Sequence, residues 1–110
     1  ASSRQLEETV AELAHQLEVA HIRLAEAERE RAGFAQEIQR LGESALSDTR
    51  EMEWAAREAA MERQIGMLQD DARAKADALQ SMTSQLADRR QEVDALRQER
   101  DRLQGQVRGL

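Results

Sequence analysis

Residues 65–110 read IGMLQDDARAKADALQSMTSQLADRRQEVDALRQERDRLQGQVRGL, and their apolar side chains return at alternating steps of four and three. Only Lys75, Arg89 and Arg100 interrupt the pattern with charge. Such a seven-residue repeat, with apolar a and d positions, is typical of a helix that buries one stripe against another helix. The stretch therefore predicts an α-helical coiled coil.

A second series with the same steps begins at Leu6 and continues to Ala45. Extended further, it would place an a position at Gly66, whereas the later series needs that position at Ile65, so one residue is missing from a strict repeat. We divide the chain into an N-terminal flank or remnant (1–5), a first heptad segment (6–45), a register shift or possible hinge (46–64) and a second heptad segment (65–110).

The composition supports long helices over a compact domain. Of 110 residues, 35% are charged and 2% are aromatic, with no Pro to break a helix and no Cys to form a disulfide. Ala, Leu, Glu, Arg and Gln dominate, as they do in coiled coils. No apolar run is long enough to span a membrane, so we expect a soluble protein without membrane insertion.

Because an isolated helix of this length cannot bury its stripe, we expect a second copy to cover it. Attractive g-to-e pairs, Arg23 with Glu28 and Glu92 with Arg97, favour a parallel, in-register pair. The predicted fold is all-α: a long parallel dimeric coiled coil with a register discontinuity between about 45 and 65, although a trimer stays open. The predicted dimer seam comprises Leu6, Val10, Leu13, Leu17, Leu24, Phe34, Ile38, Leu41, Ile65, Leu68, Leu79, Met82, Leu86, Val93, Leu96, Leu103 and Val107.

The stretch from Gly42 to Thr49 is the weakest helix former, and Asp48 followed by Glu51 could cap a new helix. Alanines after this stretch still mark one helical face, so we favour a continuous helix over a hairpin. A three-helix bundle of the spectrin-repeat kind, with turns near 42–48 and 81–84, is a further alternative. It is disfavoured because the heptads pass without interruption through 81–84.

Some apolar residues do not fit the seam and are candidates for binding a partner protein. Val19 and Ile22 form a short stripe at outward positions. A second cluster surrounds the register shift, where Trp54 is at c in the first register and at d in the second; it fills either an irregular core or a partner's pocket. The possible partner-binding residues are Val19, Ile22, Met52, Trp54, Met61 and Met67.

Catalysis, metal binding and nucleic-acid binding are all disfavoured. His15 and His21 are six residues apart, which does not place them on one helix face as metal ligands. No phosphate loop or nucleophile motif is present, and nothing on an extended helix encloses the carboxylates, so we expect no enzyme and no cofactor. The net charge of −6 and the interleaving of Arg with acids argue against nucleic acid. The acidic excess lies in residues 1–55, which suggests staggered contacts with neighbouring rods.

Heptads of Leu, Ala, Glu, Arg and Gln, such as Leu96-Arg-Gln-Glu-Arg-Asp-Arg-Leu103, resemble the rods of myosin tails, tropomyosin-like proteins, centrosomal or ciliary-rootlet proteins and golgins. The resemblance implies a structural rod that dimerises and spaces a larger scaffold protein in the cytoplasm, with the cytoskeleton as a candidate location. The alternative is an adaptor segment that binds a protein partner through an exposed apolar patch.

Overall fold

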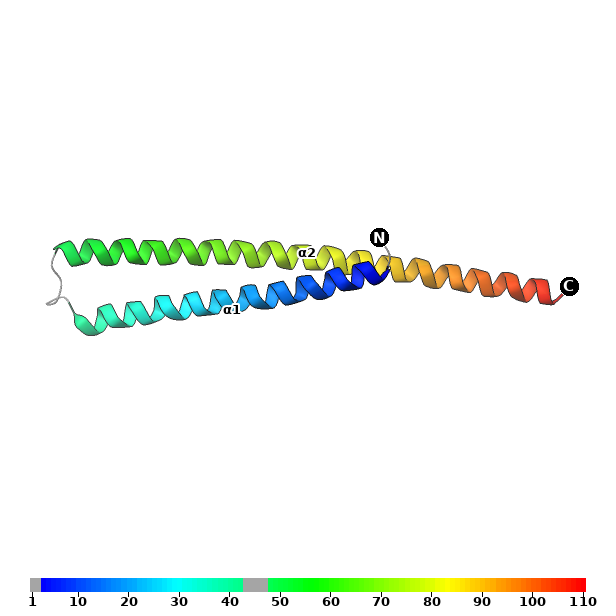
Figure 1. Ribbon diagram of the computed structural model, residues 1–110, viewed down its shortest axis with the longest axis horizontal. Helices are drawn as coiled ribbons and strands as arrows, with labels where there is room; N and C mark the ends of the chain where they lie inside the picture. The colour runs from blue at the N-terminus through cyan, green and yellow to red at the C-terminus, as the bar shows by residue number, and fades with distance from the viewer. Residues whose placement is uncertain (1–2, 43–47) are drawn as a thin grey trace. The chain divides into compact units, whose positions relative to one another are not determined.

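In the computed structural model, which describes residues 3–42 and 48–110, the chain forms two long α-helices (Figure 1). Helix α1 spans Ser3–Leu41 and helix α2 spans Asp48–Arg108. No strand occurs among the described residues. The all-α prediction is therefore confirmed.

Helix α1 ends because Gly42 leaves the helical conformation. Its φ of 69° lies in the left-handed region that glycine adopts without strain. Its N–H donates to the carbonyl oxygen of Ile38 at 3.2 Å, which satisfies one of the carbonyls that every helix C-terminus leaves open. Helix α2 begins with Asp48 and Glu51 in its first turn, where negative charge interacts favourably with the helix dipole.

Our expectation of a continuous helix through this region is wrong, since one helix ends at Leu41 and another begins at Asp48. The tendency of Gly42 to end a helix and of Asp48 and Glu51 to begin one is stronger than the tendency of the following alanines to continue it. Residues 43–47, which include the end of the first heptad segment and part of the hinge candidate, lie outside the described residues. The second turn of the three-helix alternative is absent, because α2 is helical throughout 81–84.

The chain divides into two units, and each contains a part of both helices. In the unit of residues 15–76, α1 and α2 lie antiparallel on either side of the break, as Figure 1 shows. The guanidinium of Arg57, near the start of α2, lies 4.6 Å from the ring centroid of Phe34, near the end of α1. The buried side chains of this unit are Ala20, Ala27, Met61, Ile65 and Ala72.

The other unit comprises residues 1–14 and 77–110. Here the start of α1 packs against the second half of α2, and Leu6 and Leu86 are buried. An Arg90 Nη2 group donates to Glu7 Oε1 at 3.2 Å, which joins two residues 83 positions apart in sequence. Pairing between these positions again requires the two helices to run antiparallel.

The contact between the helices is thin. Three of the seven buried hydrophobic residues are alanines, and no described side chain is completely buried. Several large apolar side chains stay exposed, among them Met67 at 72%, Leu96 at 69% and Val107 at 69%. Apolar surface is thus left for contacts beyond those within the chain.

The antiparallel arrangement can be tested with spin labels at Glu7→Cys and Arg90→Cys, which are unique because the chain has no Cys. Double electron–electron resonance on doubly labelled chains, diluted into unlabelled protein, should give a short distance below about 30 Å. In a continuous helix the same positions would be roughly 125 Å apart. A distance distribution without a short component would reject the antiparallel pairing.

Candidate self-association surface

The residues predicted as a dimer seam differ in how far the other helix of the same chain covers them. Three are buried: Leu6, Ile65 and Leu86. Ten are half-buried: Val10, Leu13, Leu17, Leu24, Phe34, Ile38, Leu68, Leu79, Met82 and Val93. Four are exposed: Leu41, Leu96, Leu103 and Val107. Most of the predicted stripe therefore packs against the other helix of the same chain.

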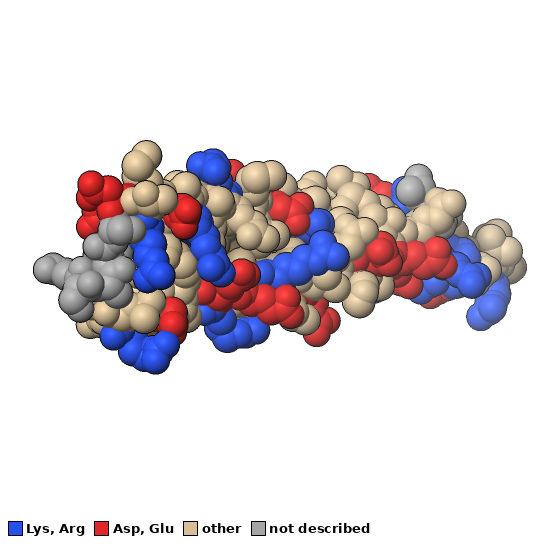
Figure 2. Space-filling view, turned by 60° about the vertical axis from the view of Figure 1, so that its left-hand side comes forward, with Lys and Arg blue, Asp and Glu red and all other residues tan. Residues whose placement is uncertain are grey.

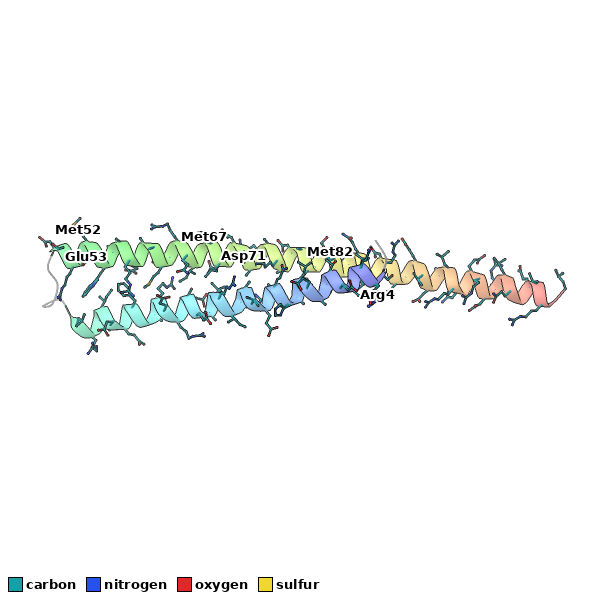
Figure 3. The ribbon with its side chains drawn as sticks, viewed as in Figure 1. Arg4, Met52, Glu53, Met67, Asp71 and Met82 are labelled. Atoms are coloured by element: carbon teal, nitrogen blue, oxygen red, sulfur yellow. The ribbon has the colours of Figure 1, made fainter. Side chains whose placement is uncertain are left out.

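The residues predicted to bind a partner are not brought together into one patch. Trp54 is half-buried and Met61 is buried, with a step of seven from Trp54 to Met61 and a step of four from Met61 to the buried Ile65. These three share the face of α2 that packs on α1. Met52 and Met67 are 74% and 72% exposed and lie on the side of α2 away from α1 (Figure 3).

The apolar stripe predicted on α1 is also divided. Val19 is half-buried, whereas Ile22 is 50% exposed. A single exposed isoleucine offers a partner little apolar area. This stripe is therefore a smaller surface than the sequence pattern indicates.

The charged residues at core positions reach acids on their own helix. Lys75 is half-buried, and its Nζ lies 2.7 Å from Asp71 Oδ2 one turn earlier. Arg100 is exposed and lies 3.1 Å from Asp101 Oδ1. A long side chain can thus occupy a seam position while its charged end stays in water.

The C-terminal part of α2 carries the most exposed portion of the heptad stripe. Every residue from 94 to 110 is exposed, including Leu96 at 69%, Leu103 at 47% and Val107 at 69%. Leu96, Arg100, Leu103 and Val107, with Glu99, Gln104 and Arg108 beside them, line one shallow surface depression. We call the first four residues the tail face; they continue the series in which Leu86 is buried against α1.

A groove lies between α1 and α2 in the unit of residues 15–76. Its lining consists of Glu28, Arg31, Ala32, Phe34, Ala35, Ile38, Glu58 and Glu62. The ring of Phe34 and the side chain of Ile38 are half-buried, and the three glutamates are exposed. We call this the acidic groove, because three carboxylates and one guanidinium surround its apolar floor.

Sequence reasoning missed the acidic groove, because its residues come from two helices that only the chain reversal after Leu41 brings together. The hinge signal at Gly42 and Asp48 was the one feature that could have revealed it. Pairing 28–38 with 58–62 across that hinge would have placed the three glutamates on a common surface.

The ion pairs on the helix surfaces are local. The hydrogen bond and charge of Arg40 lower the pKa of Glu37, and the hydrogen bonds that Arg102 donates to Glu99 raise the pKa of Arg102. Both pairs join residues three apart on one exposed helix face. Figure 2 shows acidic and basic side chains interleaved over the face in view.

Among residues 3–42 and 48–110, no group of three or more His, Cys, Asp or Glu is placed to hold a metal ion. In the same residues, neither helix has a stretch apolar enough to cross a membrane. Comparison of the chain with protein families, curated proteins and solved structures finds no match.

Two leucines of the same heptad series provide a matched test of where the stripe is covered. At low protein concentration, Leu86→Ala should lower the free energy of unfolding by about 2–3 kcal/mol, because Leu86 is 6% exposed. Leu103→Ala should change it by less than about 0.5 kcal/mol, because that side chain remains in water. Urea unfolding followed by circular dichroism measures both. Equal losses would show that the two positions are buried alike.

Proposed function

We propose that the chain is a structural coiled-coil segment that self-associates through the tail face and thereby links copies of a larger scaffold protein. One observation carries the proposal. The series that buries Ile65, Ala72 and Leu86 against α1 continues through residues 96–107, where nothing in the described chain covers it.

The apolar side chains of the tail face are sufficient for weak association. Full burial of one Leu or Val side chain contributes roughly 1.5–3 kcal/mol, and Leu96, Leu103 and Val107 would be only partly buried in a two-helix contact. Association opposes this gain with lost translational and rotational freedom. We therefore expect a small interface whose occupancy depends on concentration within the micromolar to millimolar range.

The parallel homodimer predicted from the sequence is one form that this association can take. It would place Glu92 opposite Arg97 of the second copy, which is attractive, but it would also place Arg100 against Arg100. A charged pair at an a position lowers stability while fixing strand number. Under this proposal the change of heptad register falls at the break between α1 and α2, since Trp54, Met61 and Ile65 already follow the later frame.

We further propose a non-catalytic role without a cofactor, in a cytoplasmic scaffold. The carboxylates of the described residues lie on exposed helix surfaces, where water solvates them and no enclosed site excludes it. The adaptor alternative has less support, because Trp54 and Met61 face α1 and only Ile22 of the α1 stripe is well exposed.

The double variant Leu96→Glu/Leu103→Glu tests the proposed function. Sedimentation equilibrium from roughly 10 µM to 1 mM should show a concentration-dependent mass for the wild type, and at least a tenfold weaker association for the variant. Circular dichroism should show unchanged helicity, because both leucines are exposed.

Ile22→Glu is the matched control, since Ile22 is an apolar residue of comparable exposure on α1. It should leave association unchanged. A wild type that stays monomeric throughout the range would disprove self-association, and an equal effect of Ile22→Glu would move the contact surface to α1.

A further inference from the structure

We propose that the tail face of one copy docks into the acidic groove of a second copy. This inference rests on the proposed self-association and names the surface that receives the tail. The two surfaces are chemically complementary. The tail face is an apolar stripe flanked by arginines, and the acidic groove has an apolar floor flanked by glutamates.

The acidic groove has a floor that is already held in place. Arg57 lies over one face of the Phe34 ring at 4.6 Å, a cation–π geometry that fixes the ring, and Ile38 lies one turn further along α1. Phe34 and Ile38 are only half-buried by α2, so part of the apolar area of each remains accessible in the groove.

The charges of the two surfaces are opposite. The groove lining contains Glu28, Glu58, Glu62 and Arg31, and with Arg57 over its floor the formal net charge is −1. Residues 96–108 contain four Arg and two acids, which gives +2. Attraction between two surfaces of this kind speeds encounter and selects the orientation.

Several of these charges have no ion pair within the described residues. The residues without such a pair are Glu28, Glu58 and Glu62 of the groove and Arg97 and Arg108 of the tail. By contrast, Arg102 is already bonded to Glu99. The unpaired groups can form intermolecular pairs without first breaking pairs inside the chain.

The occupant that we assign to the groove is the tail of another copy. Glu58, Glu62 and the tail face stand on the single uninterrupted helix α2, so a tail cannot fold back onto the same helix. Tail-to-tail pairing is less favourable, because it brings together two segments that are both positively charged and, in the parallel register, juxtaposes Arg100 with Arg100.

A contact between different surfaces has a consequence for assembly. Each copy offers one tail and one groove, so the contact is heterologous and extends from copy to copy, as an open chain or a closed ring. The charged pairs lie at the exposed rim, so the association should weaken as salt shortens the range of their attraction.

Charge reversal distinguishes the two partner surfaces. The groove variant is Glu58→Arg/Glu62→Arg, and the tail variant is Arg100→Glu/Arg108→Glu. In sedimentation equilibrium at low salt, each variant alone should associate at least tenfold more weakly than the wild type. An equimolar mixture should regain association, because the reversed groove fits the reversed tail and the native groove of one fits the native tail of the other.

The control is Asp70→Arg/Asp77→Arg, which changes the net charge equally at exposed positions of α2 outside the groove. It should associate as the wild type does. If circular dichroism shows that the groove variant loses helicity, Glu58→Gln/Glu62→Gln removes the charges with little change in shape and should still weaken association.

The outcomes separate this inference from the proposed function. A wild type that does not associate disproves both. If the groove variant, measured by itself, associates as strongly as the wild type, the groove is not the docking site, whereas self-association through the tail still holds. Failure of the mixture to regain association likewise overturns the pairing of tail with groove.

Discussion

An amphipathic helix in water must cover its apolar stripe, and the lengths of the two helices determine how far this chain can do so. Helix α1 has 39 residues and α2 has 61, so antiparallel pairing leaves roughly 33 Å of α2 without a counterpart. The burial of Leu6 and Leu86 and the exposure of Leu96, Leu103 and Val107 follow from this inequality. Both proposed roles of the tail face derive from the same constraint.

The small side chains along the contact set its character. Ala20, Ala27 and Ala72 are buried but contribute little area, at about 25 cal/mol per Å² of apolar surface. Larger residues appear toward the break, where Phe34 and Trp54 are half-buried and a groove remains between the helices. The apolar area that the two helices bury against each other is therefore small.

Periodicity is a local property, and it predicted helical structure in both heptad segments, although as one continuous helix and not as two. It could not identify the partner, because the same a and d residues can pack on another copy or on the other helix of the chain. The choice depended on a few residues between the series: Gly42 with its positive φ and Asp48 at the start of α2. Periodicity could not predict the acidic groove, since Glu28 and Glu58 become neighbours only after the chain has reversed.

The break after Leu41 also affects which changes of length the chain tolerates during evolution. Each helix keeps its own heptad frame, so gaining or losing a residue between Leu41 and Asp48 need not rotate either apolar face. A single insertion between Ile65 and Leu86 would instead turn the following stripe by about 100° and expose it. Insertions and deletions in related sequences should therefore concentrate at the break. In the paired stretches, related sequences should differ by substitutions only.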